Sequence, residues 1–264
     1  MSNSNYKMYI LGSRGTHSVF GDEFKEYGGQ TSCYVIKKDE HAIIVDCGSG
    51  LFSAKELLKD CKKIDILITH VHYDHIVGLL DNGYLPNDAE INFYGNFDKW
   101  SKGNVFDDYL KYPFWPINTI KGNRNIIKED GEKHILNNEA YFRSYPSTHG
   151  DDTSVFIITV NNKNVCILSD YSDQNPLDIS YIKDAEYLLY DGTFEYEDSI
   201  KYIDWGHSSW NKGCKIAKEY NVKHLLITHH NPNNNDETLR RMEKECQNEF
   251  PNSRFVRVND IFEL

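Results

Sequence analysis

Short apolar runs alternate with polar turns along most of the chain, which is typical of a protein built on β-sheets. These runs predict strands at residues 6–11, 32–36, 42–45, 64–69, 91–94, 140–145, 155–160, 165–168, 187–190, 223–227 and 254–258. Mixed or amphipathic stretches predict helical segments at 51–58, 76–80, 96–112, 211–219 and 236–246, with Asp236 as the N-cap of the last one. Because strands and helices alternate in both halves, we expect two packed sheets with helices outside. No linker separates the halves, so the prediction is one domain over residues 1–264.

One predicted strand, residues 64–69, ends in a dense group of potential metal ligands. His70, His72, Asp74 and His75 follow it in a His-x-His-x-Asp-His pattern. Neutral imidazole and carboxylate groups are ligands for zinc and similar divalent ions. At this chain's own His and Asp frequencies the pattern arises by chance with a probability of about 10^-3. The apolar flanks argue against a cluster of surface histidines, so the stretch predicts a metal site.

Other polar groups follow apolar strands in the same way, where sheet proteins place functional side chains. Seven potential ligands are too many for one tetrahedral ion, but they suit two ions that each keep a position open for water. The predicted set is His70, His72 and His149 for one ion, Asp74 and His75 for the other, with His229 and a bridging Asp170. Two such ions, about 3.5–4 Å apart, would activate a hydroxide and hold a phosphoryl or acyl oxygen. We expect zinc, and these ligands also suit manganese.

Two residues near these ligands have open roles. Asp46 ends the predicted strand 42–45 beside glycines, where its carboxylate would either orient a metal-bound histidine or cap the next helix. His230 adjoins His229, so only one of the two is expected to point at the metal. His230 is then a residue that supports a ligand or lines the pocket.

Composition restricts the partners and the compartment. The 264 residues include 29 Lys and Arg against 40 Asp and Glu, a net charge of −11 that gives no general attraction for nucleic acid. The polar start of the chain lacks the features of a signal peptide, and no apolar run approaches the roughly 18 residues of a membrane span. The six cysteines are scattered without a Cys-x-x-Cys pair, which predicts buried, reduced thiols in a cytoplasmic protein.

Four motifs together resemble those of the metallo-β-lactamase superfamily: residues 69–75, Ser147-Thr148-His149-Gly150, Leu168-Ser169-Asp170 and Ile227-Thr228-His229-His230. Their order and spacing match over nearly the whole chain. The resemblance implies an α/β protein with an αββα four-layer sandwich. It also implies a hydrolase with a dinuclear metal site at one edge of the sandwich.

Three further motifs resemble the phosphodiesterase branch of that superfamily: Gly12-Ser13-Arg14-Gly15, Asp191-Gly192-Thr193-Phe194 and Gly206-His207-Ser208-Ser209. This branch includes the tRNA 3′-end nuclease and cyclic-nucleotide phosphodiesterases. The nuclease usually has Glu near Asp191, a departure that keeps the carboxylate. The resemblance implies that His207 protonates the leaving oxygen and that Asp191 is its carboxylate partner. Asp74 is predicted to be the third catalytic residue. The alternative for His207 is a helix cap without a chemical role.

The substrate is less closely defined. The nuclease typically carries a long basic arm rich in Gly and Pro, and this chain has no such insertion. The negative charge also favours a small phosphodiester, and a 3′,5′-cyclic nucleotide is the leading expectation. Relatives of this kind are often homodimers, and the aromatic stretch Phe97–Trp115 is the candidate to reach a partner's pocket, or else belongs to the core or an interface. The alternatives are a tRNA 3′-end nuclease, a (thio)ester hydrolase, which would leave Asp191 and His207 without a role, and a non-catalytic sensor.

Overall fold

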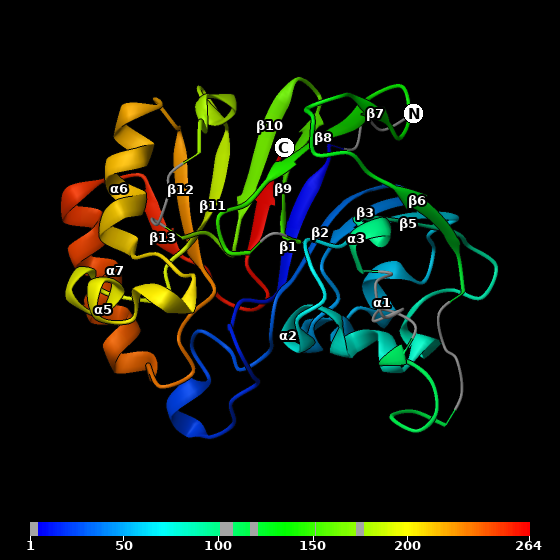
Figure 1. Ribbon diagram of the computed structural model, residues 1–264, viewed down its shortest axis with the longest axis horizontal. Coiled ribbons are helices and arrows are strands. Elements are labelled where there is room, and N and C mark those ends of the chain that lie inside the picture. The colour runs from blue at the N-terminus through cyan, green and yellow to red at the C-terminus, as the bar shows by residue number, and fades with distance from the viewer. Residues whose placement is uncertain (1–4, 101–107, 117–120, 151, 173–176) are drawn as a thin grey trace.

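Two mixed β-sheets form the centre of the computed structural model, which describes residues 5–100, 108–116, 121–150, 152–172 and 177–264 (Figure 1). The first sheet has the order β14-β1-β2-β3-β4-β5-β6, with bounds Ile261–Glu263, Lys7–Gly12, Cys33–Lys38, His41–Val45, Lys63–Leu67, Glu90–Gly95 and Asn123–Ile126. The second has the order β13-β12-β11-β10-β9-β8-β7, with bounds Ser253–Phe255, His224–Thr228, Tyr187–Asp191, Lys163–Leu168, Ser154–Val160, Ala140–Pro146 and His134–Ile135.

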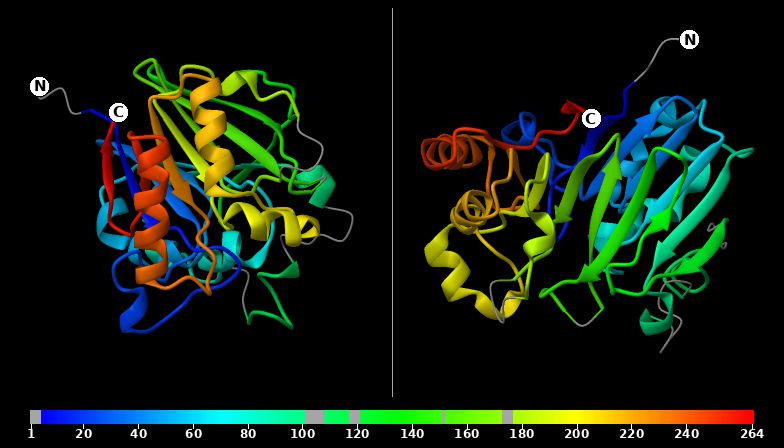
Figure 2. Two further views of the ribbon diagram at one scale, coloured as in Figure 1. Left: turned by 90° about the vertical axis from the view of Figure 1, so that its left-hand side faces the viewer. Right: turned by 90° about the horizontal axis from the view of Figure 1, so that it is seen from above.

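Helices cover the outer faces of the two sheets (Figures 1 and 2). The helices α1 (Lys55–Leu58), α2 (Tyr73–Ile76) and α3 (Phe97–Trp100) lie on the side of the first sheet. The helices α6 (Trp210–Glu219) and α7 (Asp236–Glu249) lie on the side of the second sheet, and the short α5 (Tyr196–Lys201) precedes α6. The predicted αββα sandwich is therefore confirmed.

The apolar runs are continuous because the inner strands are buried on both faces. In β9, Phe156 and Ile158 join the core between the two sheets, whereas Val155 and Ile157 join the core beneath the outer helices. This alternation follows from the two-residue period of side-chain direction in a strand. All six cysteines are buried and free, as predicted.

The topology of the two sheets brings their functional strand ends together. The strands β3, β4, β5 and β6 are mutually parallel in the first sheet, and β10, β11, β12 and β13 are mutually parallel in the second. Parallel neighbours end at the same sheet edge, so each half of the chain collects its post-strand residues there.

Several element predictions need correction. The polar composition of residues 122–131 predicts a loop. Within it, however, β6 pairs with β5 as an edge strand, and three of its four residues are exposed. The predicted helix 96–112 is helical at Phe97–Trp100, and its residues 101–107 lie outside the described part of the chain. The N-cap of α7 is Asn235, whose side chain accepts the Thr238 N–H. Asp236 instead accepts the backbone N–H groups of Glu26 and Tyr27, so it holds an N-terminal loop against α7.

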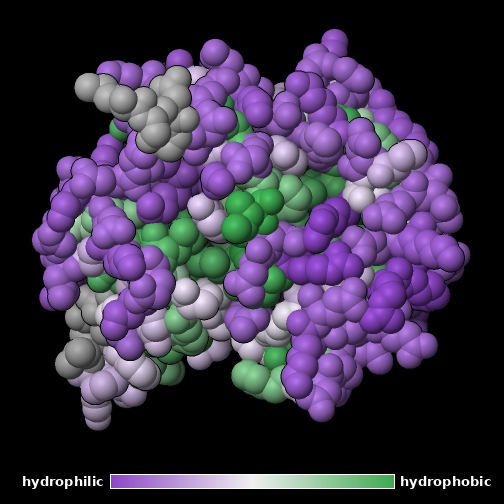
Figure 3. Space-filling view, turned by 180° about the vertical axis from the view of Figure 1, so that it is seen from behind, coloured by the Kyte–Doolittle hydropathy of each residue, from purple (hydrophilic) through white to green (hydrophobic). Residues whose placement is uncertain are grey.

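The face opposite to that of Figure 1 is mostly hydrophilic, with hydrophobic residues gathered across its middle (Figure 3). Tyr112 and Phe114, in the aromatic stretch singled out above, are also exposed. The contact of that stretch with a partner's pocket stays a prediction. Among the described helices, none combines the length and the apolar character that a membrane crossing requires.

Candidate metal centre

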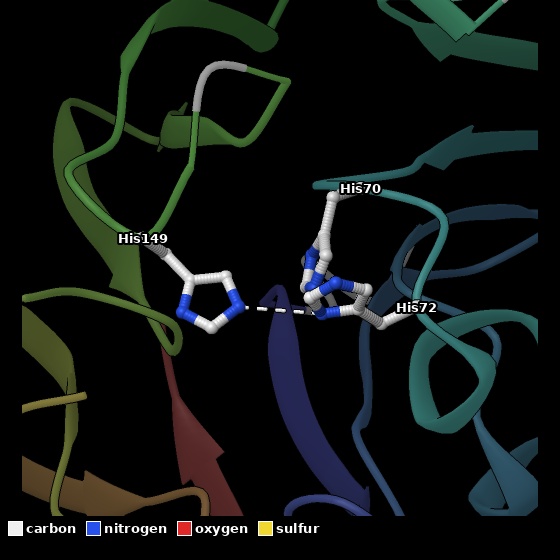
Figure 4. Close-up of side chains that lie close together, drawn as sticks. All are labelled: His70, His72 and His149. Atoms are coloured by element: carbon white, nitrogen blue, oxygen red, sulfur yellow. Dashed lines mark hydrogen bonds between the residues drawn. The ribbon is translucent and has the colours of Figure 1, made fainter. Parts of the chain in front are cut away.

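The predicted ligands come together at one edge of the sandwich, although they come from both sheets. His70 follows β4 in the first sheet, whereas His149, Asp170 and His229 follow β8, β10 and β12 in the second. Figure 4 shows the His149 ring pointing toward His70 and His72. The first three candidate ligands therefore converge from opposite sides of the molecule.

The ring nitrogens of these three histidines face one another. The His72 Nδ1 atom lies 2.7 Å from His70 Nε2 and 3.3 Å from His149 Nε2. His70, His72 and His149 form one group whose ligand atoms all lie within 4.8 Å of each other. Lone pairs that converge in this way suit a shared cation.

A second group lies beside the first. The Asp74 Oδ2 atom is 3.4 Å from both His75 Nε2 and His229 Nε2. The backbone N–H of Thr16 donates to the same oxygen at 2.7 Å and so helps to fix the carboxylate. Asp74, His75 and His229 are all buried, and they form a compact ligand set.

Asp170 lies within reach of both groups. Its Oδ1 atom is 3.9 Å from His70 Nε2 and 3.8 Å from His149 Nε2. Its Oδ2 atom is 3.2 Å from His75 Nε2, and its Oδ1 atom is 3.2 Å from His229 Nε2. One carboxylate thus faces candidate ligands of both ions, the arrangement that a bridging role requires.

The buried polar atoms at this edge test whether a metal fits. His75 Nε2, His229 Nε2 and Asp170 Oδ2 are buried, and none has a hydrogen-bond partner among the described residues. Buried polar atoms are paired in the great majority of cases, so three such atoms aimed at one region call for a ligand. Imidazole and carboxylate donors suit Zn²⁺ or Mn²⁺, and the residues present therefore fit a divalent metal site.

Asp46 supports two of these histidines from behind. Its carboxylate accepts the His75 Nδ1–H at 2.7 Å and also the Thr69 N–H and Oγ–H groups. The Thr69 hydroxyl in turn lies 3.0 Å from His70 Nδ1. These bonds place the proton of each ring on Nδ1 and leave Nε2 free to bind a metal. Asp46 therefore contacts His75 rather than capping the helix that follows.

Asp191 makes the equivalent contacts in the second half of the chain. Its Oδ2 atom accepts the His207 Nδ1–H at 2.8 Å, and its Oδ1 atom accepts the Thr193 Oγ–H at 2.7 Å. The Thr193 hydroxyl lies 2.9 Å from His229 Nδ1. Ser209, not His207, caps α6, so the capping alternative for His207 is wrong. Sequence reasoning missed both threonines, although each lies within a quoted motif.

His149 is oriented by the backbone rather than by a carboxylate. Its Nδ1 atom lies 2.6 Å from the Gly206 carbonyl oxygen, which directs Nε2 toward the metal centre. His230 has no such role, because its Nε2–H donates to the Val256 carbonyl oxygen and its ring stacks on Phe255. Burial lowers the pKa of His230 to about 3. The prediction that His230 supports a ligand or lines the pocket is therefore wrong.

The candidate ligands differ in charge, and they differ in exposure, since His70 is buried whereas His149 is partly buried and His72 is exposed. Burial lowers the pKa of His70, His72 and His149, so these rings are neutral. Burial also opposes the charged form of His229, but Asp170 and Asp74 outweigh it and raise the pKa of His229 to about 9. Burial likewise opposes the charged form of Asp170, yet His229 and His75 hold its pKa well below the usual range. A divalent cation would take the place of the protons on the charged histidines.

The metal-free protein is expected to lose stability as pH rises from 6.5 to 9. His229 has an ordinary pKa of 6.5 and a folded pKa of about 9, so its contribution is complete below pH 6.5 and disappears as pH passes 9. The loss is up to about 3 kcal/mol, at 1.36 kcal/mol per pKa unit. Thermal unfolding of chelator-treated protein at both pH values measures it. Metal-loaded protein should lose less, and an unchanged Tm of the metal-free form would contradict this assignment.

Gly15 permits the close approach of a loop to His229. A Cβ atom at this position would overlap the His229 ring. We expect Gly15→Ala to displace the ring and to weaken zinc binding by about 10- to 100-fold, the usual cost of disturbing the support of a ligand. Zinc titration against a chromophoric chelator measures the effect. Gly150→Ala is the control, because the nearest atom to its new Cβ would be at ordinary contact distance, and equal zinc affinities of the two variants would refute the prediction.

A four-layer sandwich with His and Asp ligands at one edge is the arrangement of the metallo-β-lactamase fold. The family model of the metallo-beta-lactamase superfamily matches residues 27–82. Ribonuclease Z of Enterococcus faecalis is 24% identical over an alignment that covers 84% of this chain and 87% of that protein. The mitochondrial ribonuclease Z 2 of Schizosaccharomyces pombe is also 24% identical and covers 86% of this chain, which spans only 34% of that longer protein.

Solved structures agree on the fold. The metallo-beta-lactamase fold protein YhfI of Bacillus subtilis superposes with a TM-score of 0.76 at 19% identity, covering 98% of this chain and 100% of that one. A diphosphatase of the PhnP family superposes with a TM-score of 0.71 at 20% identity, covering 99% and 98%. The predicted resemblance to the metallo-β-lactamase superfamily is confirmed, and the chain has the metallo-β-lactamase fold.

Proposed function

We propose that this chain is a phosphodiesterase with two divalent metal ions, preferably zinc, and that its substrate is a small phosphodiester such as a 3′,5′-cyclic nucleotide. The observation that carries the proposal is the Asp191–His207 pair, joined at 2.8 Å beside the candidate ligands. The His207 ring lies 4.7 Å from the rings of both His149 and His229. A proton donor in this position suits a reaction that expels an alkoxide from phosphorus.

The residues divide the work in this proposal. His70, His72 and His149 would hold one ion, Asp74, His75 and His229 the other, and Asp170 both. The ions, when bound, would supply a hydroxide nucleophile and stabilise the charge on the phosphoryl oxygens. His207 donates the proton to the leaving oxygen, and Asp191 keeps the imidazole oriented through Nδ1. A thioester hydrolase expels a thiolate, which leaves without a proton, so it would have less use for this pair.

The size of the substrate is inferred from the chain itself. The net charge of −11 opposes the binding of a long polyanion, and the sequence has no long basic insertion rich in Gly and Pro. Likeness to a diphosphatase of the PhnP family is in keeping with a substrate that contains phosphate. We extend the proposal to a homodimer in which the Phe97–Trp115 stretch contacts the partner. The similarity to ribonuclease Z proteins favours a second candidate function, which is RNA processing.

A hydrolysis panel separates the two candidates. Zinc- or manganese-loaded protein is incubated with cyclic mononucleotides, cyclic dinucleotides, bis(p-nitrophenyl) phosphate and a precursor tRNA with a 3′ trailer. We expect turnover of bis(p-nitrophenyl) phosphate and of at least one cyclic nucleotide. Cleavage of the precursor tRNA alone, with affinity that falls steeply with salt, would establish the second candidate instead.

A further inference from the structure

The hydroxyl of Thr193 connects the candidate proton donor with a candidate metal ligand. We propose that Thr193 is a positioning residue that holds the Asp191–His207 pair and His229 in a fixed mutual arrangement. The inference rests on the proposed phosphodiesterase function and adds a residue to its site. It predicts that proton donation depends on Thr193 even though Thr193 touches neither the substrate nor the metal.

The hydrogen bonds assign a direction to this connection. The Thr193 Oγ atom lies 2.7 Å from Asp191 Oδ1, 2.9 Å from His229 Nδ1 and 3.0 Å from the His229 carbonyl oxygen. A hydroxyl donates one proton and accepts two, and a carboxylate is the stronger and nearer acceptor. Thr193 therefore donates to Asp191 and accepts the His229 Nδ1–H. This arrangement leaves His229 Nε2 free for a metal.

The two oxygens of Asp191 have separate tasks. Oδ1 accepts the Thr193 N–H at 3.0 Å as well as the Thr193 hydroxyl. Oδ2 accepts the His207 Nδ1–H and the Tyr171 N–H. Because Thr193 holds Oδ1 through two bonds, it fixes the plane of the carboxylate and so the direction in which Oδ2 meets His207. Loss of the hydroxyl would leave the backbone N–H as the single bond to Oδ1.

Burial makes the hydroxyl hard to replace. Asp191 has no exposed surface, and His229 and Thr193 are 1% and 4% exposed. Solvent therefore has little access to the groups that would lose a partner on its removal. An unpaired His229 Nδ1–H and a weakened Asp191 contact would both be expected to shift position rather than recruit solvent.

Thr69 offers a matched comparison in the first half of the chain. Its hydroxyl lies between the Asp46 carboxylate and His70 Nδ1, just as that of Thr193 lies between Asp191 and His229. The histidine that bonds directly to Asp46 is His75. His75 is a candidate metal ligand, whereas the histidine bonded to Asp191 is the candidate proton donor His207. Loss of the Thr69 hydroxyl should thus disturb metal binding alone, whereas loss of the Thr193 hydroxyl should also disturb proton donation.

The experiment compares Thr193→Val, Thr193→Ser and Thr69→Val with the parent protein, each loaded with zinc and analysed for bound metal. Two substrates are used, one that expels an alkoxide and needs a proton, and bis(p-nitrophenyl) phosphate, which expels a stable phenolate. The alkoxide substrate is whichever cyclic nucleotide the parent turns over. For Thr193→Val we expect kcat on it to fall about 10- to 100-fold more than kcat on bis(p-nitrophenyl) phosphate. Thr193→Ser should restore most of the difference, and Thr69→Val should lower both activities alike, in step with zinc content.

The outcomes are distinguishable. A parent protein that hydrolyses neither substrate would defeat the proposed function itself. If the parent hydrolyses both substrates and Thr193→Val loses both activities equally, the inference is overturned. Thr193 would then only support His229. Failure of the serine variant to restore the difference would also overturn it. If circular dichroism shows that Thr193→Val does not fold, Thr193→Ala takes its place, with the same criteria.

Discussion

Asp170→Asn is expected to abolish the binding of at least one metal ion and to lower kcat by about 10^3-fold, equivalent to roughly 4 kcal/mol of transition-state stabilisation. The asparagine keeps the shape of the side chain but loses its charge and one of its two ligand oxygens. Those oxygens lie between 3.2 and 3.9 Å from the Nε2 atoms of four histidines. Zinc analysis and turnover of bis(p-nitrophenyl) phosphate measure the two effects.

Asp65→Asn is the control for this prediction. Asp65 is another fully buried aspartate, but its partners lie outside the candidate metal centre; they are His41, Lys63, Asn92 and Tyr94. Its replacement should lower Tm while zinc content and specific activity of the folded protein remain close to those of the parent. If Asp170→Asn keeps both ions and most of its activity, Asp170 does not bridge them.

The proximity of the candidate ligands could be predicted from the sequence because they follow strong strand signals. An apolar run fixes where a strand ends, and the parallel order of β10, β11 and β12 brings those ends to one edge. The positions of Asp170 and His229 after two apolar runs were therefore enough to predict that they lie close together. The same logic located Asp191 at the end of β11. His207 follows no strand, and the resemblance of its motif to the phosphodiesterase branch singled it out.

The supporting residues could not be predicted in this way. Thr69 and Thr193 are recognisable only by the two groups that each hydroxyl joins, and threonine is a common strand residue. The backbone of Asp46 and of His229 has a positive φ, 59° and 55°, which no sequence pattern reveals for residues other than glycine. Such strained positions cluster at functional sites because the surrounding contacts impose them. The edge strand β6 was missed because it buries too little apolar surface to leave a pattern.

His207→Ala is expected to lower kcat on a cyclic nucleotide by 10^2-fold or more, within the range of about 10^2 to 10^4 for loss of a general acid. The alkoxide that leaves phosphorus needs a proton, and the His207 ring, held by Asp191 at 2.8 Å, is the group placed to give it. Bis(p-nitrophenyl) phosphate expels a leaving group that needs no proton, so its turnover should change far less. Bound zinc should be unchanged.

The pattern of losses across the two substrates then decides what His207 does. His207 also lies in groups that could hold a metal, one with His149 and Asp170 and another with Asp191 and His229. If it is a ligand, His207→Ala should release zinc and lower both activities together, as Asp170→Asn does. If it is a proton donor, the variant keeps zinc and loses only the demanding reaction. His224→Ala, which removes a histidine stacked on Tyr187 away from the site, should change neither, so selective loss in His207→Ala would identify the acid directly.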